Sequence, residues 1–124
     1  NAIDPELPET PMDPSRLRQV FDNLLDNALQ HSPPRRTITI AASEVVQDGR
    51  PWIRCTVEDE GQGFRPEDLE RVFEPFFTRR ESGIGLGMSV VQRIVEEHAG
   101  LVTAGNRPQG GAVITVRLPV AAQV

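Results

Sequence analysis

Near the start of the sequence, three polar residues recur at intervals of four: Asn23, Asn27 and His31. Residues spaced in this way share one face of an α-helix, so their side chains can converge on a single ligand. Asparagine has a below-average helix propensity, and two of them inside a helix carry a cost unless their amides find partners. Oxygen ligation of Mg²⁺ together with phosphates is one such partnership, and hydrogen bonds to water or backbone are the alternative.

A carboxylate followed by two glycines comes at the end of a predicted strand: Asp59, Gly61 and Gly63. The glycines allow the backbone to turn sharply or to approach a ligand closely. A carboxylate in this place can accept a hydrogen bond from an adenine amino group. Taken alone, the pattern also fits a plain acidic turn.

Three glycines at alternate positions, Gly83, Gly85 and Gly87, precede a predicted helix. Free backbone amides at a helix N-terminus bind phosphate, aided by the helix dipole. The spacing differs from the G-x-G-x-x-G pattern of dinucleotide-binding domains. All 13 basic residues are arginine. A Walker P-loop and a eukaryotic-type protein kinase both need a lysine, so both are excluded.

Two long helices must position these residues. Asp13 and Pro14 supply a cap and a first-turn proline, and apolar residues at helical spacing predict a helix from about Pro14 to His31. A second helix follows the glycines, and we expect Gly100 to end it with a positive φ. Its apolar positions are Met88, Val91, Ile94 and Val95.

Alternating apolar and polar residues predict two β-hairpins. The first pairs residues 37–42 with 53–58 across a turn at 47–51, and the second pairs 101–104 with 112–118. A short helix is expected at 66–71. This element order predicts an α+β fold, a two-layer α/β sandwich whose mixed, mostly antiparallel sheet carries the helices on one face.

Length and composition narrow the class of protein. We expect the 124 residues to form one domain, residues 1–124. A formal charge of -5 argues against a nucleic-acid-binding surface. No apolar run approaches the roughly 20 residues needed to span a bilayer, and the first residues do not resemble a signal peptide, so we expect no membrane contact. Cys55, the only cysteine, is expected to fill a strand.

Five segments, taken in order, resemble the N, G1, F, G2 and terminal glycine boxes of bacterial sensor histidine kinases. They are residues 23–28, 59–63, 73–77, 83–87 and 110–111. The resemblance covers nearly the whole chain, and five boxes in sequence are far more specific than any one of them. It implies the Bergerat fold, which DNA gyrase, mismatch-repair ATPases and heat-shock chaperones share.

The resemblance also implies roles for individual residues. Asn27 would ligate Mg²⁺ with the support of Asn23, and Asp59 would accept a hydrogen bond from the adenine amino group. The other residues expected to contact the nucleotide or to anchor a lid over it are His31, Gly61, Gly63, Phe73, Phe76, Phe77, Gly83, Gly85, Leu86 and Gly87.

Two positions depart from the family pattern and each removes a potential phosphate contact. Gln30 stands where the family often has a basic residue, and Ile84 where it often has Thr or Ser. Arg79 and Arg80, between the F and G2 boxes, are candidates to supply positive charge to the γ-phosphate. We therefore count both arginines with Asn23 and Asn27 as the expected catalytic residues.

By this resemblance, we expect an enzyme, a protein histidine kinase domain that binds ATP and Mg²⁺. It would donate the γ-phosphoryl group to a histidine on a separate dimerisation domain, outside these 124 residues, with a response regulator as the later partner. The isolated domain would be a cytoplasmic monomer, with an inner-membrane anchor on the parent protein left open.

Three alternatives stay open. They are a hydrolysing ATPase of the gyrase or mismatch-repair kind, an anti-sigma-type serine kinase, and a degenerate nucleotide-binding module. The first needs a glutamate as general base one turn before the metal-binding asparagine. That position is Asn23, and an amide cannot take the proton.

Overall fold

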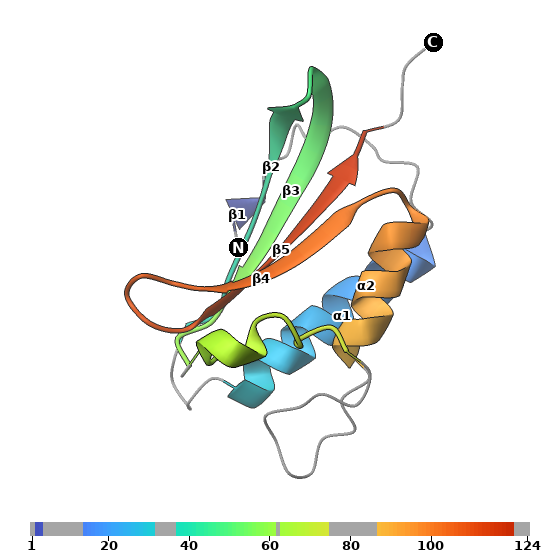
Figure 1. The fold of residues 1–124 in the computed structure, drawn as a ribbon. Helices are drawn as coiled ribbons and strands as arrows, with labels where there is room; N and C mark the ends of the chain where they lie inside the picture. Colours follow the sequence, from blue (N-terminus) through green and yellow to red (C-terminus); the bar gives the residue numbers. More distant parts are fainter. Residues whose placement is uncertain (1, 4–13, 32–36, 62, 75–86, 121–124) are drawn as a thin grey trace.

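The computed structural model describes residues 2–3, 14–31, 37–61, 63–74 and 87–120. Within these ranges the chain forms a five-stranded sheet in the order β1-β2-β3-β5-β4, with α1 and α2 packed on one face (Figure 1). β1, Ala2–Ile3, runs parallel to β2, whereas the other strand pairs are antiparallel. The predicted two-layer architecture with a mixed, mostly antiparallel sheet is confirmed.

Helix α1 spans Pro14–His31, as the spacing of its apolar residues predicted. Val20, Leu24 and Ala28 are almost completely buried against the sheet. They follow one another at four-residue intervals, so they form the inward stripe of an amphipathic helix. Asn23 and Asn27 lie beside this stripe and are half-buried.

Strands β2, Thr39–Gln47, and β3, Arg50–Glu58, form the first hairpin. The predicted turn of five residues is too long, because only Asp48 and Gly49 lie outside the ladder, at φ 53° and 76°. Two successive residues with positive φ make the tight turn whose twist matches that of the strands. The strands therefore extend several residues beyond the expected range.

Strands β4, Leu101–Asn106, and β5, Ala112–Pro119, complete the sheet. Their inward side chains join those of β3 and both helices in a single core. Cys55 lies in that core, and burial raises the pKa of its thiol, which agrees with the expected strand-filling role. The core members on the strands are Ala42, Ile53, Cys55, Val57, Val102, Ala112, Ile114, Val116 and Leu118.

The expected helix at residues 66–71 is replaced by a 3₁₀ turn, η1, at Pro66–Asp68. Backbone hydrogen bonds at three-residue spacing run from Asp68 to Arg65, from Arg71 to Asp68 and from Glu74 to Arg71. A string of such turns satisfies backbone groups without the four-residue bonds of an α-helix.

Helix α2 spans Gly87–Glu97 and buries all four predicted apolar positions. Its end differs from the prediction, because Ala99 at φ 60° is the left-handed residue and Gly100 is not. The amides of Gly100 and Ala99 donate to the carbonyls of Val95 and Glu96, a Schellman arrangement. Gly100 is needed for space, since a Cβ there would lie 2.5 Å from the Arg117 carbonyl oxygen.

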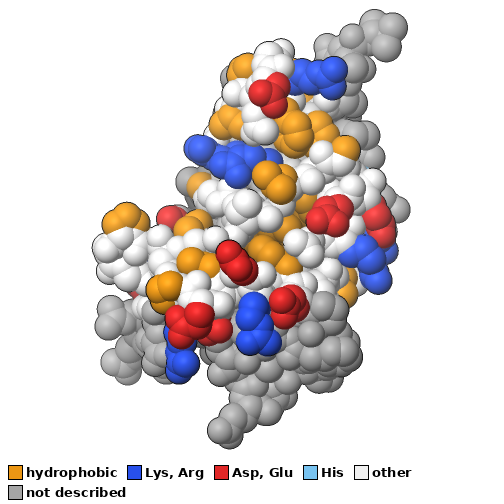
Figure 2. Space-filling model, viewed as in Figure 1, with side chains coloured by type: hydrophobic (Ala, Val, Ile, Leu, Met, Phe, Trp, Pro, Cys, Tyr) orange, Lys and Arg blue, Asp and Glu red, His pale blue; other side chains and the backbone are white. Residues whose placement is uncertain are grey.

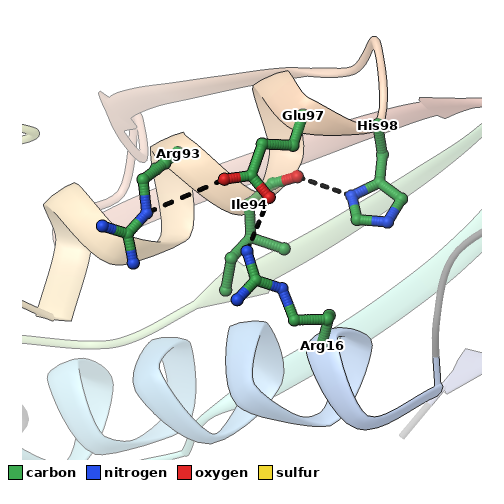
Figure 3. A network of polar contacts seen from close by, with 5 residues as sticks. All are labelled: Arg16, Arg93, Ile94, Glu97 and His98. Carbon is green, nitrogen blue, oxygen red and sulfur yellow. Dashed lines mark hydrogen bonds and ion pairs between the residues drawn. The ribbon is translucent and has the colours of Figure 1, made fainter.

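The two helices are antiparallel and are joined at one end by charged side chains (Figure 3). Arg16, in the first turn of α1, donates to the Glu97 carboxylate at 2.6 Å, and Arg93 lies 3.9 Å from its other oxygen. His98 Nδ1 lies 2.7 Å from the Ile94 carbonyl oxygen in the same region. These contacts fix the helix ends farthest from Asn27.

Charged side chains of both signs are interspersed over the view in Figure 2. Hydrophobic side chains are scattered between them over the same view. Val46, on β2, is 77% exposed and is one of three large exposed hydrophobic residues in the described ranges, with Leu29 and Leu101. No described helix is long and apolar enough to cross a membrane.

Candidate nucleotide-binding site

Asp59 follows the last residue of β3 and is the one buried polar or charged residue in the described part of the chain, at 3% exposure. Its backbone amide donates to the Ala112 carbonyl at 3.0 Å, which continues the pairing with β5. Its Oδ1 accepts hydrogen bonds from the Gly61 amide at 2.8 Å and the Ala112 amide at 3.2 Å.

The two carboxylate oxygens of Asp59 therefore differ in their surroundings. Oδ1 is satisfied by two backbone donors, while Oδ2 has no hydrogen-bond partner among the described residues. Asp59 Oδ2 is not sealed from solvent, so it is an acceptor that a ligand donor can reach. The aspartate is held in one orientation by the backbone and offers one acceptor, which fits an exocyclic amino group.

The loop after Asp59 is in close contact with two other parts of the chain. Thr37 donates its backbone amide to Glu60 Oε1 at 2.6 Å, which connects the loop to the start of the first hairpin. A Cβ on Gly111 would overlap the Asp59 carbonyl oxygen, so only glycine fits there. Gly61 and Gly63, predicted to admit the nucleotide, both lie in this loop.

Two contacts from the β4–β5 turn were missed by sequence reasoning. The side-chain amide of Asn106 pairs with both the amide and the carbonyl of Phe64, each at 2.7 Å. Arg107 Nη1 donates to the Asp59 carbonyl at 3.0 Å. Both residues are more than 40 positions from their partners, and no local pattern in the sequence indicates such pairing.

The edge of α1 that carries Asn23 and Asn27 lies against the start of α2. A Cβ placed on Gly87 would lie 3.7 Å from Asn23 Oδ1. Thus the helix that is expected to ligate the metal lies against the helix N-terminus that is expected to bind phosphate. Asn27 is one turn farther along the same half-buried edge.

The other predicted site residues differ in how much of each the structure describes. Phe73 is half-buried and packs against the core, which agrees with an anchoring position at the end of the 66–74 segment. The side chain of His31 is not described, although its backbone ends α1. The residues that lie outside the described ranges are Phe76, Phe77, Arg79, Arg80, Gly83, Gly85 and Leu86.

Comparison with known proteins identifies the family of this chain. Residues 12–122 match the family described as histidine kinase-, DNA gyrase B-, and HSP90-like ATPase. The chain belongs to this family. Because the match covers nearly the whole chain, the family assignment made from the five boxes is confirmed.

Relatives of this ATPase domain include named sensor histidine kinases. Sensor histidine kinase ZraS of Salmonella typhi is 42% identical over 111 residues, which is 90% of this chain and 23% of that protein. Sporulation kinase A of Bacillus subtilis is 35% identical over 107 residues, 86% of this chain and 17% of that protein. The chain spans less than a quarter of the length of either relative.

Solved structures confirm the Bergerat architecture expected for this ATPase family. The nucleotide-free catalytic domain of histidine kinase ThkA superposes with a TM-score of 0.82 at 30% identity, covering 95% of this chain and 75% of that one. Full-length ShkA in complex with AMPPNP gives a TM-score of 0.76 at 28% identity, covering 99% of this chain and 26% of that one. These names do not favour a gyrase-type ATPase or a serine kinase.

Proposed function

We propose that this domain binds Mg-ATP and donates the γ-phosphoryl group to a histidine on a separate dimerisation domain. One observation carries the proposal: Asn23 of α1 lies against Gly87 at the N-terminus of α2. A metal ligand and phosphate-binding amides must be neighbours in any site that holds a metal-bound triphosphate. Family membership and the sensor kinase relatives support the same assignment.

Recognition of the base is assigned to Asp59. Its Oδ2 would accept a hydrogen bond from the adenine amino group, while Oδ1 stays bound to the Gly61 and Ala112 amides. Guanine presents a carbonyl oxygen at the corresponding edge, so two acceptors would face each other. The carboxylate thus provides a reason for selecting ATP over GTP.

Mg²⁺, when bound with the phosphates, would neutralise the charge that develops as the γ-phosphoryl group leaves. The amide oxygen of Asn27 would complete the metal's oxygen ligands, and Asn23 would orient the same edge of α1. Neither amide can accept a proton from water. The chain's own residues in this position therefore bind and orient without activating a water molecule, which favours transfer over hydrolysis.

The partners belong to the same proposal. The matched segment is 23% of one relative and 17% of the other, which leaves room in them for a phosphoacceptor domain. A dimerisation domain bearing the histidine would be the immediate partner, and a response regulator would receive the phosphoryl group later. A location in the cytoplasm, where ATP is supplied, follows from this activity.

The test is transfer in trans. The chain is mixed with a dimerisation domain that carries the acceptor histidine, and γ-labelled ATP is added with or without Mg²⁺. We expect label on the added domain that is lost in acid and retained in base, and only when Mg²⁺ is present. Label that survives acid would indicate phosphoserine and contradict the proposal, as would release of phosphate without any transfer.

A further inference from the structure

The turn that joins β4 to β5 lies against the loop that leaves β3 (Figure 1). We call residues 59–64 the base loop; Gln62 within it is not described. Three residues in or beside the turn touch the base loop: Asn106 at the end of β4, Arg107 at the start of the turn, and Gly111 at its end. None of these contacts is a backbone hydrogen bond of the sheet. They connect the turn to the base loop instead.

The side-chain amide of Asn106 binds both backbone groups of Phe64, as a neighbouring strand would. Its Oδ1 accepts the Phe64 amide and its Nδ2 donates to the Phe64 carbonyl, both at 2.7 Å. Only a side chain with one acceptor and one donor side by side can make this pair. The side chain also needs the space left by Gly63, whose Cβ would lie 2.7 Å from Asn106 Oδ1.

The backbone of Arg107 is fixed by hydrogen bonds within the β4–β5 turn, and its side chain binds Asp59. Its backbone amide donates to the Gly111 carbonyl at 2.8 Å, and its carbonyl accepts the Gly110 amide at 3.0 Å. From this closed turn, Nη1 reaches the Asp59 carbonyl at 3.0 Å. Its Nε is buried without a hydrogen-bond partner in the described part of the chain, so the guanidinium is kept there at a cost.

Together these contacts set the orientation of the Asp59 carboxylate. Ala112, the first residue after the turn, donates its amide to Asp59 Oδ1, and Arg107 fixes the carbonyl of the same aspartate. A shift of the turn would therefore rotate or displace Asp59, and with it the unpartnered Oδ2. Discrimination between a donor and an acceptor on the base depends on where that oxygen points.

We propose that Asn106 and Arg107 are positioning residues that hold the base loop, so that Asp59 distinguishes an adenine amino group from a guanine carbonyl. The proposal rests on the assignment of Asp59 as the adenine acceptor. Neither residue touches the base: each acts through Phe64 or Asp59. Loss of either should affect the choice between nucleotides as well as their affinity.

The first experiment needs no nucleotide. Amide hydrogen exchange is measured for Gly61 and Phe64 in the wild-type chain and in Arg107→Met, Asn106→Leu and the control Arg54→Met. Arg54 is exposed on β3 and faces away from the helices, so its loss should change neither amide. We expect faster exchange at Phe64 in Asn106→Leu and at Gly61 in Arg107→Met. Unchanged exchange at both amides would overturn the proposal.

The second experiment measures selectivity. Calorimetric dissociation constants for Mg-ATP and Mg-GTP are compared in the same proteins and in Arg107→Lys, with melting temperatures taken in parallel. Removal of a hydrogen bond of this kind should weaken ATP binding by about threefold to tenfold and lower the ATP-to-GTP preference by a similar factor. Arg107→Lys keeps a donor and should restore part of the preference.

The outcomes separate this proposal from the proposed function. If ATP and GTP weaken equally while the melting temperature falls, the two residues are only structural and the proposal is wrong. A wild-type chain that binds neither nucleotide would overturn the proposed function together with the selectivity. The exchange measurements would still decide whether the turn holds the loop.

Discussion

Arg16 Nη2 lies 2.6 Å from Glu97 Oε2, which joins the first turn of α1 to the last turn of α2 (Figure 3). At the other end of α2, Gly87 lies against Asn23, which is in the middle of α1. The ion pair therefore lies at one end of α2, while the candidate phosphate site is at the other. Side-chain exposures of 34% and 48% place the pair at the surface, in contact with solvent.

Glu97→Gln should lower the free energy of unfolding by less than about 1 kcal/mol, because exposed ion pairs are largely offset by solvation. The difference should shrink further in 1 M salt, where charges are screened over a few ångströms. Chemical denaturation at low and high salt checks this. Glu96→Gln is the matched control, since Glu96 is exposed on the same turn and forms no ion pair with the described residues. A salt-independent loss in Glu97→Gln would contradict the electrostatic explanation.

Ala99→Gly should stabilise the domain, because a residue with a Cβ is strained at φ 60° and glycine is not. The expected gain is about 0.5–1 kcal/mol, or roughly 2–4 °C in melting temperature. Gly100→Ala should do the opposite and cost about 1–3 kcal/mol, because its Cβ would crowd the Arg117 carbonyl. Equal effects of the two substitutions would show that the helix end is not the Schellman arrangement described.

Asn27→Ala should weaken the Mg²⁺-dependent part of ADP and ATP binding, since one amide oxygen would leave the metal's ligands. Calorimetry with and without Mg²⁺ measures that part directly. Gln19→Ala, an exposed amide on the same helix, controls for general effects on α1. Should Asn27→Ala bind the nucleotide as the wild type does under both conditions, Asn27 is not a metal ligand.

Asp59→Asn should reduce affinity for ATP by about 1–3 kcal/mol, the usual cost of a mismatched buried polar group. The new Oδ1 can still accept the Gly61 and Ala112 amides, so the loop should remain in place. The new NH₂ would then face the adenine amino group, donor against donor. Competition between ATP and GTP in both proteins tests this, and a wild type that binds the two equally would remove the assignment.

The chain alone should not label itself with phosphate, because His31 and His98 are its only histidines. His98 is half-buried in the turn that follows α2, and its Nδ1 makes a 2.7 Å contact with the Ile94 carbonyl oxygen, as a ring nitrogen that donates to backbone does. In-line transfer needs an acceptor that can align with the γ-phosphate, which a fixed residue of the donor domain does poorly. Incubation with γ-labelled ATP, followed by mapping of any acid-labile label, checks both histidines.

Regular elements could be predicted because their signals are local. The apolar stripe of α1 and the strict alternation along β3 and β5 reflect which face of each element is buried, and both recur in the structure. Nearby residues such as Asn23 and Asn27 share a helix edge by geometry alone. The five motif boxes identified the family for the same reason, since each box is a short run of adjacent residues.

The remaining features depend on residues that meet only after folding. Ala99, and not Gly100, adopts the left-handed conformation, and Gly100 is required for another reason, because a Cβ there would crowd the Arg117 carbonyl of β5. Asn106 and Arg107 reach the base loop across more than 40 residues of sequence, since the β4–β5 turn lies beside the end of β3. The sequence alone identified the family and indicated the residues that we propose for the chemistry. Only the tertiary structure decided how Asp59 is held, because the groups that hold it come from a distant part of the chain.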